Sequence, residues 1–394
     1  MAVQSEPQTG SSNWLYDARL RAIFYQIATA AIFVGVVFWL TNNTIDNLNE
    51  RGIATGFKFL GQPTGFGLPF YLIPYSETST YGTAFVVSVL NTLFISFIGI
   101  VLATIIGFLF GVMRLSRNWL ISKIATVYLE TVRNVPLLLQ ILFWYFGVLQ
   151  TLPQVRNSVN MADTVFLNIR GLYMPKPHFE TAFLVPVILF IGAIVATWVL
   201  ARWAKRRQAD TGEQFPIWRT GIGLILGLPI VGFLVTGMPV TLEYPALKGF
   251  NFQGGLVLVP EFMALLAALT LYTAAFIGEI VRAGIQSVSH GQTEAAFALG
   301  LRPSVTMRLV IIPQALRVIV PPLTSQYLNL TKNSSLAAAI GYPELVAVFA
   351  GTVLNQTGQA VECILMTMAV YFTISLCISI FMNWYNKRIA LVER

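Results

Sequence analysis

Long apolar runs separated by short polar stretches dominate the 394-residue chain. Runs of about 20 apolar residues can cross the hydrocarbon core of a bilayer as helices. The pattern predicts eight spans, near residues 23–41, 84–112, 136–150, 181–203, 217–238, 259–286, 313–332 and 361–384. The mixed stretch 119–134, before the short third span, is typical of a helix at the membrane interface. The partly apolar stretch 336–355 could re-enter the membrane.

Composition agrees with lipid as the solvent of this chain. Hydrophobic residues make up 56% of it and charged residues only 11%, whereas a soluble domain is about 25% charged. We therefore expect an all-α integral membrane protein. His178 and His290 are too few for a metal site, and Cys363 and Cys377 form no disulfide framework. No phosphate-binding Gly-rich loop and no catalytic motif occurs, so we expect neither a cofactor nor an enzyme.

Lysine and arginine predict the orientation. With the N-terminus inside, 17 basic residues fall inside and 6 outside, the outside six being Arg51, Lys58, Arg156, Arg170, Lys176 and Lys248. The positive-inside rule therefore predicts that both termini are cytoplasmic. This loop bias accounts for the net charge of +8, and nucleic acid is not an expected partner. One basic turn is expected to anchor at anionic lipid headgroups, through Arg202, Lys205, Arg206 and Arg207.

The first apolar run is expected to remain in the protein as a transmembrane helix. It is longer than a signal-peptide core, and the following TNNTIDNLNE offers no small-residue cleavage site. The polar tail before it, MAVQSEPQTGSSN, is expected to be disordered.

The segment 290–315, HGQTEAAFALGLRPSVTMRLVIIPQA, is too polar to span a bilayer. Thr293 can cap a helix start, and Glu294 favours the positive end of a helix. Gly300 can end that helix in a left-handed conformation, and Pro303 can open a second one. Pro313 is expected to mark the entry to the next span. The segment therefore predicts a short helix, a glycine elbow and a second helix, all facing the cytosol.

This segment resembles the EAA motif of permease subunits in ATP-binding-cassette importers. That motif reads E-A-A, three residues, Gly, nine residues and I-x-L-P, and the residues that match it are Glu294, Ala295, Ala296, Gly300 and Pro313. Val310 and Ile312 replace the usual Ile and Leu. Stretches 128–147, 272–288 and 328–345 are similar to polar amino-acid permeases, in the same order. The resemblance implies a type I importer permease fold whose coupling helix docks on a cytoplasmic ATPase.

The chain is larger than typical members of that family, which have about five spans. It resembles the enlarged general L-amino-acid permease subunits of bacterial importers. The implied organisation is a cytoplasmic tail 1–21, an extra first helix with a periplasmic loop 22–83, a core in two parts 84–150 and 257–394, and an insertion 151–256 with two extra spans. The implied location is the bacterial inner membrane. The implied partners are two ATPases, a second related permease, a periplasmic binding protein, L-amino acids and lipid.

Charged residues within spans are candidate pathway residues, because a charge at the membrane centre costs at least about 2.5 kcal/mol. Glu279 could meet the ammonium of an amino acid. Lys332, or the helix start after Asn333 and Ser334, could meet its carboxylate. Alternatively, Glu279 only pairs with Arg282 on its own helix, and Lys332 binds a backbone carbonyl or a partner.

Other carboxylates have more ordinary interpretations. Glu130 and Arg133 are expected to form a structural pair at the cytoplasmic gate. Glu344 and Glu362 are expected near the outside, either solvated or in contact with the binding protein.

Two other functions compete with the importer permease. One is an ion- or proton-driven secondary transporter that uses Glu279 and Lys332 as relay groups. The other is a membrane receptor or scaffold that shares the docking helix.

Overall fold

The computed structural model describes residues 18–389 except 51, 53–54 and 162. The predicted disordered tail and both chain ends lie outside the described residues. The helices are α1 (Ala18–Glu50), α2 (Tyr81–Arg114), α3 (Trp119–Asn134), α4 (Leu137–Leu142), α5 (Leu184–Thr211), α6 (Ile217–Val235), α7 (Pro260–Gln286), α8 (His290–Ala298), α9 (Pro303–Thr306), α10 (Ile312–Asn333), α11 (Leu354–Thr357) and α12 (Ala360–Ile389). Wider π-helical turns join several of them: η3 (Phe143–Val148), η7 (Met307–Ile311) and η9 (Val346–Val353).

The expected transmembrane spans are confirmed. In the described part of the chain, seven helices are long and apolar enough to cross a membrane. The short third expected span, near 136–150, corresponds to a bent pair, in which α3 meets the helical stretch Leu137–Thr151 at 107°. Pro136 stands at that bend, and a proline cannot continue the backbone hydrogen bonding of a preceding helix.

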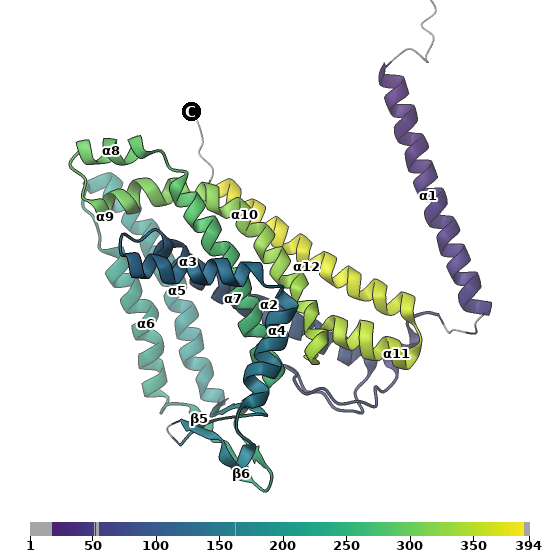
Figure 1. Cartoon of the computed structure of the whole chain (residues 1–394). Coiled ribbons are helices and arrows are strands. Elements are labelled where there is room, and N and C mark those ends of the chain that lie inside the picture. The colour runs from purple at the N-terminus through teal and green to yellow at the C-terminus, as the bar shows by residue number, and fades with distance from the viewer. Residues whose placement is uncertain (1–17, 51, 53–54, 162, 390–394) are drawn as a thin grey trace, which may run out of the picture.

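The centre of the bundle is the contact between α2 and α7, with α10 packed on α7 and α12 on α10 (Figure 1). Small residues recur every four positions along α2, at Gly99, Ala103, Gly107 and Gly111. A Cβ atom built on Gly107 would lie 2.6 Å from the Cβ of Ile277. One built on Gly111 would lie 2.7 Å from the carbonyl oxygen of Gly278. The two helices approach this closely because α2 has no side chain at these positions, so its backbone meets the side chains and carbonyl groups of α7.

Helices α5 and α6 form a hairpin that packs mainly on itself. Helix α5 continues to Thr211, beyond the expected end of its span at residue 203. Its turn into α6 uses Gly212 at φ 75°.

Eight short strands flank this hairpin and were not predicted. They form the antiparallel sheet β1-β2-β3-β8 and the antiparallel pairs β4-β5 and β6-β7. Their bounds are β1 (Val159–Met161), β2 (Val165–Asn168), β3 (Gly171–Met174), β4 (Lys176–Phe179), β5 (Val240–Glu243), β6 (Ala246–Lys248), β7 (Asn251–Gln253) and β8 (Leu256–Leu258). We call this group of strands the cap. It lies at the opposite end of the molecule from α8 (Figure 1).

Helix α1 stands apart from the bundle (Figure 1). None of the residues in its most apolar stretch is buried. The segment that follows it returns to the bundle, where Phe59 is buried against Tyr81 at the start of α2. The connection also reaches α12, because the backbone N–H of Gly56 donates to Glu362 Oε1 over 2.5 Å.

Candidate functional site

Helix α8 and its glycine elbow form an exposed projection at one end of the bundle (Figure 1). Gly300 has φ 75°, the left-handed conformation expected at this position. The Gly300 N–H donates to Phe297 O over 2.9 Å, and the Leu301 N–H donates to Ala296 O over 3.1 Å. These two bonds satisfy the last carbonyls of the helix in a Schellman arrangement. The elbow is therefore rigidly defined by the chain itself.

The exposed face of α8 carries apolar side chains. Phe297 is 49% exposed and Leu299 is 80% exposed, whereas Ala296 points inward and is buried. Glu294 is solvent-facing and lies 2.9 Å from His290 Nδ1 one turn earlier. Two large apolar side chains on a projecting loop are typical of a surface that another protein covers.

The start of α8 differs from the expectation. The helix begins at His290, with Ser289 before it, so Thr293 lies within the first turn and does not cap it. The helix starts three residues before Thr293, and its first turn is closed by the Gln292 N–H, which donates to the Ser289 carbonyl over 3.0 Å. Ser289 takes the N-cap position, but its side chain makes no capping hydrogen bond, so capping chemistry alone does not fix the start of this helix.

After the elbow, the chain is continuously helical from Pro303 to Asn333, through α9, η7 and α10. Pro303 opens α9 as predicted, and Pro313 lies in the first turn of α10. The π-helical turn η7 joins these two helices. Gln314 Nε2 on α10 donates to Gln292 Oε1 on α8 over 3.2 Å. Helices α8 and α10 are therefore linked by a side-chain contact as well as through the chain.

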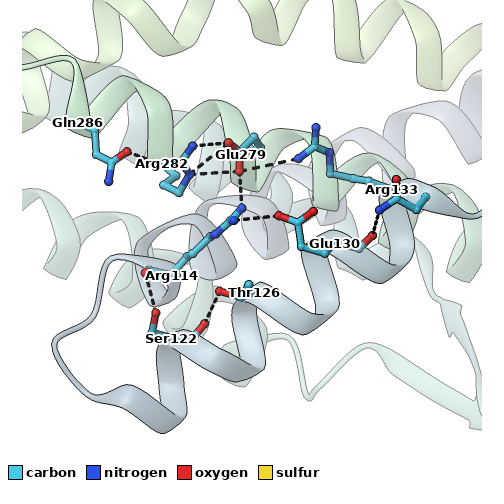
Figure 2. Close-up of polar contacts among 9 residues, drawn as sticks. Arg114, Ser122, Thr126, Glu130, Arg133, Glu279, Arg282 and Gln286 are labelled. Atoms are coloured by element: carbon cyan, nitrogen blue, oxygen red, sulfur yellow. Dashed lines mark hydrogen bonds and ion pairs between the residues drawn. The ribbon is translucent and has the colours of Figure 1, made fainter.

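A cluster of charged side chains ties α2, α3 and α7 together (Figure 2). Glu279 on α7 is its centre. Arg114, the last residue of α2, places Nη1 at 2.5 Å from Glu279 Oε2. Arg282 donates from Nε to both Glu279 oxygens, over 3.1 and 3.2 Å, and also from Nη2. The Glu279–Arg282 contact is the ion pair within α7 that the spacing of three residues predicted as one alternative.

The remaining members of this cluster, Glu130 and Arg133, come from α3. Arg114 Nη2 donates to Glu130 Oε1 over 2.9 Å, so Arg114 bridges the two carboxylates. Arg133 Nη1 lies 3.8 Å from Glu279, and its guanidinium stacks over the ring of Phe276. The expected Glu130–Arg133 pair is not found among the described residues. Arg114 takes the place of Arg133 because the end of α2 lies beside α3.

The polar stretch at residues 332–335 ends α10, as predicted. The α-helix stops at Asn333 and a 3-10 helix, η8 (Ser334–Ile340), continues to Gly341. The Ser334 hydroxyl donates to Thr331 O over 2.7 Å and is buried. Lys332 is exposed, and its ammonium makes no hydrogen bond or ion pair with the part of the chain that the structure describes.

Glu279 and Lys332 are not brought together. Gly284 on α7 faces Ile319 on α10, because a Cβ on Gly284 would meet the Ile319 side chain. Measured from this crossing, Glu279 lies five residues back along α7 and Lys332 thirteen residues forward along α10. Because the two helices run in opposite directions, both lie on the same side of the crossing. Their heights along the bundle differ by roughly 12 Å at 1.5 Å per residue. The two charges are therefore separate features of the bundle.

Two carboxylates expected to be solvated are in fact buried. Glu344 is 0% exposed and Glu362 is 8% exposed. Glu344 accepts from the backbone N–H groups of Val346 and Ala347, over 2.8 and 2.7 Å, and from the Tyr371 hydroxyl over 3.0 Å. It therefore caps η9 and joins it to α12, which leaves no exposed surface for a contact with a binding protein.

The turn before Glu344 is fixed to α2 as well. Asn91 Nδ2 donates to Pro343 O over 2.9 Å, and Leu345 N–H donates to Thr92 Oγ1 over 3.1 Å. Sequence reasoning missed Asn91, Thr92 and Tyr371. The available signal was a glutamate directly before an apolar helical run, which is typical of a helix N-terminus.

Comparison with known proteins identifies the family. Residues 99–391 match the family described as "Binding-protein-dependent transport system inner membrane component". The chain is 53% identical to the general L-amino acid transport system permease protein AapQ of Rhizobium johnstonii, over 100% of this chain and 99% of that protein. It is 46% identical to the glutamate/glutamine/aspartate/asparagine transport system permease protein BztB of Rhodobacter capsulatus, over 100% of both. One chain of a solved amino acid ABC transporter superposes with a TM-score of 0.47 at 22% identity, over 78% of this chain and 95% of that one.

The chain therefore belongs to the family of binding-protein-dependent transport system inner membrane components. The resemblance noted from Glu294, Ala295, Ala296 and Gly300 is confirmed at the level of the family. The protein is a multi-span transport subunit of the inner membrane that works with the other components of such a system.

Proposed function

We propose that this chain is the permease subunit through which an ATP-driven importer moves L-amino acids across the inner membrane. The proposal rests on sequence identities of 53% and 46%, over the whole chain, to two permeases that are named for amino-acid transport. We further propose a heterodimer with a related permease, two ATPases on the cytoplasmic side and a periplasmic binding protein on the other side.

Helix α8 is the proposed contact with the ATPase, which makes its end of the molecule cytoplasmic. Three observations support this role: the EAA motif, the exposed Phe297 and Leu299, and the hydrogen bond from Gln314 to Gln292. ATP-driven movement of the ATPases would pull on α8 and, through η7, on α10. The polar break at residues 332–335 lies at the far end of α10, so the same helix connects the ATPase contact to the proposed pathway.

Lys332, Asn333 and Ser334 are the proposed pathway residues. Lys332 carries an ammonium with no partner among the described residues, and the α-helix ends beside it. A cation at a broken helix suits the carboxylate of an amino acid. Glu279 has a different proposed role, that of holding α2, α3 and α7 together. Its carboxylate is already in contact with three arginines, which also disfavours it as the proton relay of an ion-driven transporter.

Reconstituting the chain with its partner permease, ATPase and binding protein tests the proposal. We expect uptake of L-amino acids that requires both ATP and the binding protein. Uptake that persists without ATP, driven by an ion gradient, would contradict it.

Gly300→Val tests the role of α8. Valine at φ 75° costs about 1–2 kcal/mol. Apart from the two neighbouring residues, no atom of the described residues lies within 4 Å of the new Cβ to add a clash. We expect normal membrane insertion but at least about tenfold lower uptake and ATPase association. Gly212→Val is the matched control, because Gly212 also has φ 75° and open space but lies in the α5–α6 turn. Equal effects of the two variants would remove α8 from coupling.

A further inference from the structure

A crevice of about 290 Å³ lies where α2, α10 and α12 meet. On α10 its lining begins at Leu316, one turn after the start of the helix, and ends at Tyr327. These two residues are roughly 16 Å apart along the helix, which is about half of the hydrocarbon thickness of a bilayer. Phe381 and Tyr385 on α12 also line the crevice, and both are exposed. The crevice is therefore open to the surroundings of the bundle over the depth of one membrane leaflet.

The interior of this crevice is apolar apart from two hydroxyl groups at its inner end. The Thr104 and Tyr327 hydroxyls are hydrogen-bonded to each other over 3.0 Å, and Thr104 also donates to Ile100 O over 2.7 Å. Because these polar groups are already paired within the protein, the interior requires no polar group from a ligand. A channel of this length and polarity suits a single acyl chain.

Two arginines stand at the mouth of the crevice, at the end of the bundle where α10 begins and α12 ends. Arg317 donates from Nε to Ile389 O over 3.1 Å, which fixes it beside the end of α12. Arg388 lies seven residues after Phe381, so the two share one side of α12. Its guanidinium is held over the Trp384 ring, with Cζ 4.5 Å from the centroid. The terminal nitrogens of both arginines make no hydrogen bond or ion pair with the described residues.

The helices around the mouth offer these arginines no counter-charge. Helices α2 and α10 contain no Asp or Glu, and the single carboxylate among the described residues of α12, Glu362, stands in its first turn at the opposite end. On the neighbouring helices α3 and α7, Glu130 and Glu279 are already paired with Arg114. Two held cations above an apolar channel therefore match the two parts of an anionic phospholipid.

We propose that one anionic phospholipid occupies this crevice, with its phosphate on Arg317 and Arg388 and one acyl chain between α2, α10 and α12. Basic pockets between transmembrane helices on the cytoplasmic side bind lipids of this class. The proposed contact of α8 with the ATPase makes this end of the bundle cytoplasmic. The lipid would then fill the space between α10, which follows the ATPase contact, and two helices on which α10 packs. This site goes beyond the proposed function.

Photolabelling with lipid probes tests the site. The assembled transporter is reconstituted in vesicles that contain a trace of phosphatidylglycerol or phosphatidylcholine, each with a diazirine at the end of one acyl chain, and labelled peptides are identified by mass spectrometry. We expect phosphatidylglycerol to label the peptides that contain Thr104 or Tyr327 at least about fivefold more than phosphatidylcholine does, because each arginine near the surface favours an anionic lipid about fivefold. Labelling needs no transport, so it reads the lipid site even if the proposed function were wrong.

Matched variants separate the crevice from a general attraction to the membrane surface. Arg388→Gln should lower labelling by phosphatidylglycerol about fivefold. Lys387→Gln should change it less than about twofold, because Lys387 lies two residues after Tyr385 and so points away from the crevice. Leu316→Trp fills the mouth and should lower labelling at least about fivefold, whereas Val318→Trp should not, because Val318 is exposed on the opposite side of α10.

Several outcomes would overturn the lipid site. They are equal labelling by the two probes, equal effects of the two charge variants, and labelling that Leu316→Trp does not reduce. The absence of any label would mean that another subunit covers the crevice. Loss of the label on addition of inorganic phosphate, to the same extent as with unlabelled phosphatidylglycerol, would mean that the arginines hold a free anion instead.

Discussion

The α2–α7 centre and the α5–α6 hairpin are both pairs of long apolar helices, but they are built differently. In the most apolar stretch of α7, 61% of the residues are buried, against 11% in each of α5 and α6. Both pairs approach at glycines, Gly107 and Gly111 in the centre and Gly221 and Gly232 in the hairpin. The central pair also carries the charged cluster around Glu279 at one end. The hairpin carries its charges in exposed pairs such as Arg207–Glu213. Apolar length alone thus predicts insertion into a membrane, whereas contacts with several further helices and paired charges distinguish the centre from the hairpin.

Glycine substitutions are expected to give the largest difference in stability loss between the α2–α7 centre and the α5–α6 hairpin. Gly107→Leu would push a side chain against Ile277 and the carbonyl oxygen of Ala274, which a Cβ already meets at 2.6 and 2.9 Å. Overpacking against backbone should cost about 3 kcal/mol, the upper end of the usual range. Gly227→Leu in α6 is the control, because a Cβ there meets nothing within 4 Å. We expect Gly107→Leu to abolish monodisperse protein in detergent and Gly227→Leu to purify normally. Equal yields would show that α2 and α7 are not closely packed.

The sequence predicted the spans in both regions but not the way in which they differ. Apolar runs identify helices such as α7 and α5 equally well, because hydropathy measures compatibility with lipid and not contact with protein. The spacing of Gly99, Ala103, Gly107 and Gly111 was a readable signal for the close approach of another helix. It could not identify α7 as the partner, since the contact joins residues more than 150 positions apart.

The candidate site was predictable to the extent that it is local. The Gly300 elbow and the Glu279–Arg282 pair depend on residues three to five positions apart, and both were predicted. Arg114 was missed because its two carboxylate partners lie on different helices. The burial of Glu344 was missed because a carboxylate beside a span is usually solvated, and only folding brings Tyr371 to it. The strands of the cap were missed because three or four residues are too few to show an alternating pattern.

Removing a charge should cause a smaller difference in stability loss between the α2–α7 centre and the α5–α6 hairpin than glycine substitution does. Glu279→Gln leaves Arg114 and Arg282 without their shared counter-charge. We expect a loss of about 1–3 kcal/mol, less than for a fully buried pair because the Glu279 side chain is 25% exposed. The matched variant Glu213→Gln breaks the exposed Arg207 pair and should change stability by at most about 0.5 kcal/mol.

Thermal unfolding in detergent, together with uptake of a neutral and a cationic amino acid, measures both effects. Lower stability with uptake reduced equally for both substrates would support the role of Glu279 in holding the helices. An intact, stable complex whose uptake falls mainly for the cationic amino acid would instead make Glu279 a pathway residue.

The smallest effect is expected in the cap beside the α5–α6 hairpin. The His178 side chain lies 2.8 Å from Glu243 Oε2 across the β4–β5 pair, and this hydrogen bond holds the pKa of Glu243 below its ordinary value. A lowered folded pKa means that the carboxylate stabilises the pair fully above about pH 4 and that this contribution is lost as the pH falls through the folded pKa. The protection factors of the β4 and β5 amides, which are exchange rates corrected for the intrinsic effect of pH, should therefore fall only in acid, with no change in unfolding of the bundle.

Glu243→Gln should remove this pH dependence, because the amide does not titrate. Glu180→Gln, one residue after β4, should keep it, because Glu180 does not contact His178. If Glu243→Gln retained the acid-dependent exchange, the opening would arise from another group. If the bundle also unfolded earlier in acid in the unmodified protein but not in Glu243→Gln, the cap would be coupled to the α2–α7 centre, and the independence of the two regions would be wrong.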